Sequence, residues 1–578
     1  MLSFGRLEAK AALAHRRVRS MPEKISRHRA APSVFGVAIA LTLTGIVGLQ
    51  IIGYSHARLI FLALLYVCVL PALVWYWHES RSDTRNAFTI PDGRILLILV
   101  FAAVTISMSY SFYLYDRAYS LADESSYLFQ ARVFAAGQMK ADPMPGSPDT
   151  PEVKPVELYF ENQVHTIHGW FSKYPPGWPL VLAAGYLAKC PWLVNPILGI
   201  LVLLLVDRIA ALWGRTTRIV AVGVASCSAY AMLYSTGFLS HSCAALAGTA
   251  GVGAAFKGAR DGRLRWVLLC FGLLILDTEI RPYTALVFFI VCAGYTLSAF
   301  RANPTMFARC TITIGAATAA AVALLLFVNH AYTGNFMISP YAYARGSTTV
   351  AELTLDPSRI AHTIESFWRV AATDTLCFTF PFLFVAAIYA CINERSYRRE
   401  LIALAVLFPI LIFAYTFQSE ASGSFDGERY YYEGYPAICV VAARGLALLV
   451  DRWNLRPAAV RHGLLALLAV HAIFIAIMIH DVKARLNPWR TAYESSVRAP
   501  SSDVVFLNFV HTPSFASRHA NWNEARWKKA TTVFLNDPGV ERRGEVTCRF
   551  HRHSYRVVVY DGQNRSATAK DFLVACRP

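Results

Sequence analysis

The sequence predicts a polytopic α-helical membrane protein, and three observations lead to this prediction. Of its 578 residues, 55% are hydrophobic and only 16% are charged, whereas about a quarter of the residues in a soluble domain are charged. The mean hydropathy is +0.39. The apolar residues also fall in blocks of roughly 18 to 24 residues, the length that a helix needs to cross the hydrocarbon core of a bilayer. These observations argue against a soluble protein.

The apolar blocks predict about 13 transmembrane helices. Two additional N-terminal helices in 34–94 precede a transmembrane core over 95–480. The segment 178–189 is too short to cross and follows two prolines, so we expect it to lie along the membrane interface. The predicted spans are 34–53, 59–77, 95–115, 192–212, 218–237, 239–257, 266–279, 282–300, 310–330, 375–392, 400–417, 435–450 and 463–480.

The positive charge sets the expected orientation and does not indicate a nucleic-acid partner. The formal net charge is +18, but Arg and Lys cluster in the short connections between alternate spans, as they do in cytoplasmic loops. The basic segment 1–33 is expected to be a cytoplasmic tail near anionic lipid. It lacks the apolar core and cleavage site of a removable signal peptide.

The opposite face then receives a large loop, 116–177, and the C-terminal segment 481–578. Alternating β-branched and aromatic runs in that segment (DVVFLNFV, TTVFLN, YRVVVYDG) predict a small extracytoplasmic domain, α/β or mostly β. Of the 12 cysteines, Cys548 and Cys576 lie in this polar segment. The sequence leaves open whether they form a disulfide, which an oxidising compartment would allow.

The loop 116–177 carries the residues best suited to chemistry. Asp123 and Glu124 precede SSYLFQARVFAAG, whose apolar spacing predicts a short amphipathic helix on the membrane surface. A carboxylate at this place is suited to act as a general base or to hold a divalent cation. The alternative is that both charges only stabilise the helix N-terminus.

The same loop ends in a rigid basic turn. Lys173 and Tyr174 stand directly before Pro175 and Pro176, and the prolines restrict the backbone so that the ammonium group is held in one place. A fixed ammonium near the interface suits a lipid-linked phosphate. The alternative is that Lys173 simply extends toward lipid headgroups.

Further charged and aromatic residues fall at span ends on the same face. Arg281, in DTEIRP, could bind phosphate bidentately, or could form an ion pair with Asp277 or Glu279 that only stabilises the bend. In SFDGERYYYEGYP a cation, stacking surfaces and an acceptor suit a sugar or its phosphate, although interfacial tyrosines are also common anchors. The residues selected here as donor or substrate ligands, besides those of the basic turn, are Arg281, His241, Arg429, Tyr431 and Glu433.

These segments resemble the C-type (GT-C) membrane glycosyltransferases, which include protein O-mannosyltransferases and the bacterial lipid A aminoarabinose transferase. The segments that carry the resemblance are DESSYLFQARVFAAG, SKYPPGWPLVLAAGYL, IRPYTAL and TGNFMISPYAY. They are most similar to the bacterial dolichyl-phosphate-mannose mannosyltransferase-like group. The resemblance covers roughly 95–578, and the two spans that precede it depart from the family pattern.

The resemblance implies a GT-C fold and transfer of a sugar, with inversion, from a polyprenyl-phosphate donor to an extracytoplasmic glycan, lipid or protein. Asp123 would be the base with Glu124 assisting, and Lys173 with Arg281 or Arg429 would hold the donor phosphate. It leaves open whether Mg²⁺ or Mn²⁺ takes part. The implied location is the bacterial inner membrane, with the loop and the C-terminal domain in the periplasm.

A different class of function is a transporter or flippase for a lipid-linked saccharide. That function predicts ionisable residues or broken helices near the bilayer midplane, and repeats between the two halves of the chain. The polar groups of this sequence lie at span ends instead, which favours the enzyme.

Overall fold

The computed structural model describes residues 107, 111, 121–145, 162–226, 228–344, 383–416, 429–453, 490–492, 494–495, 503–511, 522–523 and 525–576, and all that follows concerns these. The predicted tail 1–33, the helices of 34–94 and the span 463–480 lie outside the described residues, as does nearly all of 95–115.

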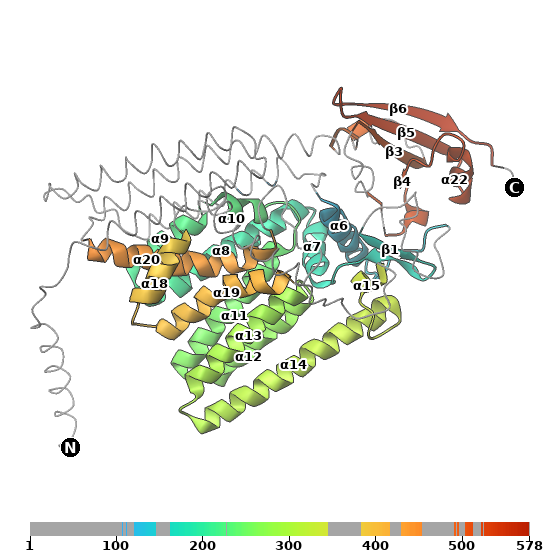
Figure 1. The fold of residues 1–578 in the computed structure, drawn as a ribbon. Helices are drawn as coiled ribbons and strands as arrows, with labels where there is room; N and C mark the ends of the chain where they lie inside the picture. Colours follow the sequence, from blue (N-terminus) through green and yellow to red (C-terminus); the bar gives the residue numbers. More distant parts are fainter. Residues whose placement is uncertain are drawn as a thin grey trace, which may run out of the picture.

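The described core is a bundle of apolar helices that follow the predicted blocks (Figure 1). Four stretches are long and apolar enough to cross a membrane: Pro191–Trp213, Pro282–Phe300, Pro304–Thr333 and Arg429–Arg452. The bundle comprises η3 (Pro191–Leu193), α8 (Val194–Ala210), η4 (Ala211–Trp213), α9 (Arg215–Ser226), α10 (Ala229–Tyr234), α11 (His241–Asp261), α12 (Leu264–Thr278), α13 (Pro282–Phe300), α14 (Pro304–Thr333), α18 (Leu383–Asn393), α19 (Arg398–Thr416), η6 (Arg429–Gly434) and α20 (Tyr435–Arg452).

Two helices differ from their predicted spans. The span expected over 218–237 is divided into α9 and α10, because the Ser228 hydroxyl accepts the Ala231 N–H at 3.3 Å and starts a new helix. Helix α14 is longer than the predicted 310–330. Asn303 caps its start and Gly334, in the left-handed region, ends it, as expected for these residue types.

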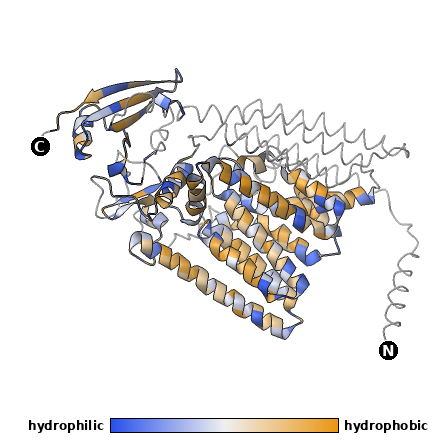
Figure 2. Cartoon of the chain, turned by 180° about the vertical axis from the view of Figure 1, so that it is seen from behind, coloured by the Kyte–Doolittle hydropathy of each residue, from blue (hydrophilic) through white to orange (hydrophobic). Residues whose placement is uncertain are grey.

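The helices differ in how deeply they are buried. In α20, 72% of the apolar window is inside the protein, against 11% for α14. Helix α14 therefore exposes apolar side chains along its length, as Figure 2 shows, and a lipid environment suits such a surface. Helix α20 packs closely on α18, since a Cβ at Gly445 would overlap the carbonyl oxygen of Ala386.

The loop 116–177 is more ordered than its sequence predicts. It contains α6 (Ala122–Ala135) and a hairpin of β1 (Gln163–Thr166) and β2 (Gly169–Ser172), and α7 (Gly177–Leu187) follows it. The prediction of an amphipathic surface helix was wrong for α6, which is buried on nearly all sides. Helix α7 lies where the interfacial helix was expected, and it exposes Leu180 and Leu187.

The C-terminal segment is a small α/β domain, as predicted. Its sheet has the strand order β4-β3-β5-β6, with β3 parallel to β4 and β5, and β6 antiparallel to β5. Cys548 and Cys576 form a disulfide. Strand β6 was not predicted, because SATAKDFL lacks an apolar alternation. The elements are β3 (Val504–Val510), η8 (Trp527–Lys529), β4 (Val533–Asn536), α22 (Arg543–Arg549), β5 (Ser554–Asp561) and β6 (Ser566–Leu573).

This domain contacts the loop that carries α6 (Figure 1). The Arg132 side chain, in the last turn of α6, donates from Nε to the Asn523 carbonyl oxygen at 3.1 Å. The Asp142 N–H donates to the Ala525 carbonyl oxygen, also at 3.1 Å. The C-terminal domain is thus joined to the far end of the helix that begins with the predicted catalytic carboxylates.

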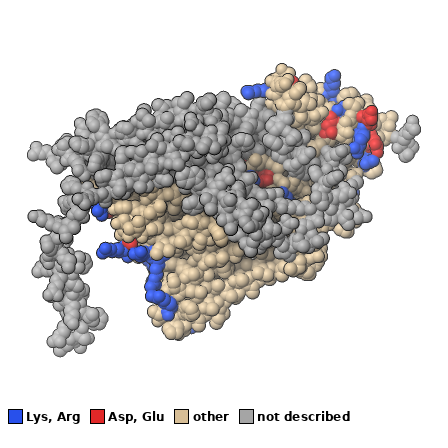
Figure 3. Space-filling view, in the orientation of Figure 1, with Lys and Arg blue, Asp and Glu red and all other residues tan. Residues whose placement is uncertain are grey.

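Basic side chains gather at the end of the bundle that lies away from the C-terminal domain (Figure 3). This end holds the connections α11–α12, α13–α14 and α18–α19. The described helices therefore place the basic connections and the loop 116–177 at opposite ends, as alternation predicts. Which end faces the cytoplasm stays a prediction.

Candidate active site

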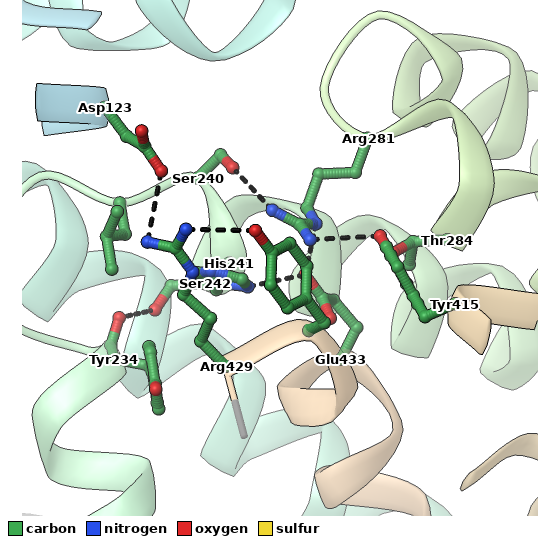
Figure 4. Close-up of polar contacts among 12 residues, drawn as sticks. Asp123, Tyr234, Ser240, His241, Ser242, Arg281, Thr284, Tyr415, Arg429 and Glu433 are labelled. Carbon is green, nitrogen blue, oxygen red and sulfur yellow. Dashed lines mark hydrogen bonds and ion pairs between the residues drawn. The ribbon is translucent and has the colours of Figure 1, made fainter. Parts of the chain in front are cut away.

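Within the described part of the chain, a phenol, an amide and a guanidinium contact the carboxylate of Asp123, in the first turn of α6. The Tyr174 hydroxyl donates to Oδ1 at 2.6 Å, and the Asn162 amide donates to the same oxygen at 2.9 Å. The Arg429 guanidinium lies 3.1 Å from Oδ2, and Figure 4 shows this contact. The two oxygens therefore have different partners, because Oδ1 accepts from neutral groups and Oδ2 faces a cation.

Tyr174 is fixed in the role of donor to this carboxylate. Burial raises its pKa well above the ordinary value, and the nearby charge of Asp123 raises it further. The phenol therefore keeps its proton at neutral pH. Its ring contacts that of Tyr127, with centroids 4.8 Å apart, so the hydroxyl is aimed by packing as well as by its hydrogen bond.

A second ion pair is more deeply buried. Arg281, immediately before α13, places Nε 2.7 Å from Oε1 of Glu433 in η6, whose side chain is 0% exposed. Nδ1 of His241 lies 2.9 Å from the same oxygen, and we assign the proton to this nitrogen because a carboxylate only accepts. Arg281 also donates to the Tyr415 hydroxyl at 3.0 Å.

The two arginines flank one aromatic ring. The Arg281 guanidinium carbon lies 5.5 Å from the centroid of Tyr430, and that of Arg429 lies 4.9 Å from it. Arg429 also donates to the Tyr430 hydroxyl at 3.0 Å. Both distances are typical of cation–π contacts. Both guanidinium groups therefore contact the same ring while each faces its own carboxylate.

The turn that follows Lys173 and the turn that precedes Arg281 are joined by a backbone hydrogen bond. The Gly177 N–H donates to the Glu279 carbonyl oxygen at 2.7 Å, and a Cβ at Gly177 would lie 2.5 Å from that oxygen. The close approach requires glycine, and it fixes the Lys173 turn against the turn that carries Arg281. The Lys173 ammonium lies 4.7 Å from the centroid of the Tyr341 ring, in α15 (Pro340–Ala344).

Two predicted site residues are buried beside these groups. Glu124 is 1% exposed and accepts the Phe238 N–H at 2.8 Å, so it joins α6 to the backbone before α11. Tyr431 is also 1% exposed and packs against the rings of Phe408 and Tyr415. Both placements indicate structural roles, and neither residue is part of the function proposed below.

The alternative pairing of Arg281 was wrong. Arg281 pairs with Glu433 and not with Asp277 or Glu279, whose buried carboxylate oxygens have no hydrogen-bond partner within the described ranges. Asn162, Tyr415 and Tyr430 were missed as site residues. Tyr430 lay in the tyrosine run already singled out, whereas no sequence pattern marks the other two.

The residues around Asp123 do not fit a bound divalent cation. Its contacts within the described ranges include a guanidinium, a phenol and an amide nitrogen, which repel a cation or compete with it. Among the residues that the structure describes, no group of three or more His, Cys, Asp or Glu side chains is placed to hold a metal ion.

The described structure is that of a helical membrane protein whose site combines the partly exposed carboxylate of Asp123 with the guanidinium groups of Arg281 and Arg429. The chain is similar to ArnT from Cupriavidus metallidurans bound to undecaprenyl phosphate (12% identity, TM-score 0.47, 82% of this chain and 94% of that chain). It is also similar to the Archaeoglobus fulgidus oligosaccharyltransferase in complex with Zn and sulfate (12% identity, TM-score 0.47, 80% of this chain and 68% of that chain). A third similar structure is the arabinosyltransferase EmbB from Mycobacterium smegmatis (15% identity, TM-score 0.32, 73% of this chain and 45% of that chain).

These solved structures are GT-C glycosyltransferases, the class that the sequence resembles. No protein-family model matches the chain, and no curated protein matches it.

Proposed function

We propose that this protein transfers a sugar from a polyprenyl-phosphate donor to an acceptor on the outer face of the membrane. One observation supports this most: the carboxylate of Asp123 lies in a cluster that also holds the guanidinium groups of Arg281 and Arg429, both in contact with the Tyr430 ring. A base and a phosphate-binding pair of cations are the two parts that this displacement needs.

In the proposed reaction Asp123 takes the proton from the acceptor hydroxyl or amine as that atom bonds to the anomeric carbon. The bond between the anomeric carbon and the phosphate oxygen breaks, and its electron pair stays on that oxygen. The anomeric configuration is inverted. Polyprenyl phosphate leaves with an added negative charge, which Arg281, Arg429 and Lys173 stabilise.

The surrounding residues hold these groups in place. Tyr174 and Asn162 orient Asp123 through Oδ1. Glu433 holds the guanidinium of Arg281, and His241 holds Glu433. In this proposal His241 and Glu433 act through Arg281 and do not touch the donor, because both are buried. This changes their role from the substrate ligands expected from the sequence.

We also propose the bacterial inner membrane as the location, with the N-terminus in the cytoplasm and the loop 116–177 and the C-terminal domain in the periplasm. The disulfide between Cys548 and Cys576 supports an oxidising compartment for that domain. The acceptor is a cell-envelope glycan, lipid or protein. Undecaprenyl phosphate, bound in one of the similar structures, is a suitable ligand for tests on this chain.

The test uses purified protein in nanodiscs with a panel of polyprenyl-phosphate sugars and envelope acceptors, and follows donor consumption and acceptor modification. Asp123→Asn should abolish turnover while it keeps donor binding. The control Asp207→Asn breaks the ion pair with Arg218, 2.8 Å long, and should leave turnover unchanged. Equal turnover in wild type and Asp123→Asn would refute Asp123 as the base. Donor binding without turnover in any protein would favour transport of the lipid-linked sugar.

A further inference from the structure

The two arginines of the site are held by their carboxylates to different degrees. The side chains of Arg281 and Glu433 are 12% and 0% exposed, and the carboxylate is also bonded to His241. The side chains of Arg429 and Asp123 are 16% and 19% exposed, and their contact is longer, at 3.1 Å against 2.7 Å. A buried pair whose carboxylate is also hydrogen-bonded to a histidine is hard to separate, whereas a partly exposed pair separates more readily. Arg429 is therefore the arginine that can exchange its partner.

The pair between Asp123 and Arg429 opposes the role proposed for each residue. A carboxylate that faces a guanidinium is a weaker base than one whose cation has moved away. An arginine that neutralises a carboxylate offers less charge to a phosphate. Within the described residues, Oδ1 accepts two hydrogen bonds, from Tyr174 and Asn162, and Oδ2 faces Arg429. We therefore assign the acceptor proton to Oδ2.

We infer that the donor phosphate takes Arg429 from Asp123, so that donor binding itself frees the base. A phosphate accepts two parallel hydrogen bonds from a guanidinium, and Arg281, a second cation, contacts the same Tyr430 ring as Arg429. Asp123 does not move when Arg429 leaves, because Tyr174 and Asn162 still hold Oδ1. The donor therefore binds before the acceptor proton is removed. This inference rests on the proposed function, since it requires a phosphate-bearing donor.

The exchange predicts an unusual pattern of affinities for undecaprenyl phosphate, measured on the full chain in nanodiscs with four proteins: wild type, Asp123→Asn, Arg429→Gln and the double variant. Asp123→Asn removes the residue that competes for Arg429, so it should tighten binding on the order of threefold to tenfold. Arg429→Gln should weaken binding. In the double variant the substitution at Asp123 should have no further effect, because there is no arginine left to release.

The double variant separates exchange from simple repulsion between Asp123 and the phosphate. Repulsion alone would tighten binding equally with and without Arg429, and that result would overturn the inference. Unchanged or weaker binding by Asp123→Asn would also overturn it. The control Asp207→Asn breaks the ion pair with Arg218 and should leave the affinity unchanged. If Arg429→Gln does not fold, Arg429→Lys replaces it, because this variant keeps the positive charge and should fold and bind undecaprenyl phosphate.

The outcomes for the exchange and for the proposed function are distinguishable. If the protein transfers sugar but the effects of Asp123→Asn and Arg429→Gln on the affinity for undecaprenyl phosphate are additive, the exchange is refuted and the proposed transferase activity is retained. A wild-type protein that neither binds undecaprenyl phosphate nor consumes any polyprenyl-phosphate sugar would refute both. Initial-rate kinetics give an independent test. If the donor releases Arg429 from Asp123, substrate binding should be ordered, with the donor before the acceptor. Random binding of the two substrates would contradict the exchange.

Discussion

Replacing Glu433 by Gln should destabilise the fold, and the structure sets the size of the effect. Oε1 faces Nε of Arg281 at 2.7 Å and Nδ1 of His241 at 2.9 Å, and the side chain is 0% exposed. Removing one partner of a buried ion pair leaves the other charge without compensation, which lowers the free energy of unfolding by about 3–5 kcal/mol. Removing both charges is milder, so Arg281→Gln should recover part of the loss.

The measurement is unfolding in detergent by titration with SDS, followed by tryptophan fluorescence, for the two single variants and the double variant. The expected coupling between the two positions is on the order of 2 kcal/mol. Effects that simply add would refute the reasoning that Glu433 exists to compensate Arg281. Glu394→Gln is the matched control: it breaks the pair with Arg444, where Glu394 is 2% exposed, and should lower stability without changing the affinity for undecaprenyl phosphate.

Three further predictions concern the loop. Tyr174→Phe removes a charge-assisted hydrogen bond to Asp123 and should lower turnover by about tenfold to a hundredfold, measured at saturating donor. Burial lowers the pKa of His165 to about 3 from 6.5. The unfolded chain therefore takes up a proton that the folded protein refuses, and stability should fall as pH drops from 6.5 toward 3, less so in His165→Gln. Gly177→Ala forces a Cβ to 2.5 Å from the Glu279 carbonyl oxygen and should lower the free energy of unfolding by about 1–3 kcal/mol, measured by SDS titration.

Each of these predictions has an outcome that contradicts it. Unchanged turnover in Tyr174→Phe would show that Asn162 alone orients Asp123. Thermal midpoints of wild type and His165→Gln that fall in parallel between pH 6.5 and 4.5 would remove His165 from the pH dependence. The control for Gly177→Ala is Gly272→Ala, because Gly272 has no atom within 4 Å of its added Cβ. Equal stability of Gly177→Ala and Gly272→Ala would show that the backbone around Gly177 and Glu279 moves to accommodate the added methyl group.

The helices could be predicted because the physical signal is local. A block of apolar residues long enough to cross a membrane needs no knowledge of its neighbours, so α8, α13 and α20 lie close to their predicted spans. Strands β3, β4 and β5 could also be predicted, because their β-branched and aromatic residues form recognisable alternating runs. Strand β6 was not, because its side chains are mostly exposed and its place comes from pairing with β5 and not from burial.

The sequence offered candidate site residues and not their contacts. Asp123 and Arg429 were both selected from the sequence, but their pairing depends on how α6 and η6 approach one another, and no local pattern encodes that. Tyr431 was selected, whereas the structure places the ring of Tyr430 against both arginines, for a similar reason. Neighbouring residues in a 3₁₀ helix point in different directions, so the fold decides which ring meets the arginines.

The contact between Arg132 and Asn523 has a consequence for the carboxylate at the other end of the same helix. Asp123 and Arg132 are separated by about 14 Å of α-helix, and a helix is stiff over such a length. A rotation of α6 about its axis turns both side chains together, so it would move Asp123 relative to Tyr174. The hydrogen bond from Arg132 to Asn523 opposes such a rotation. A domain that is separate from the helical bundle would thus help to orient the proposed base.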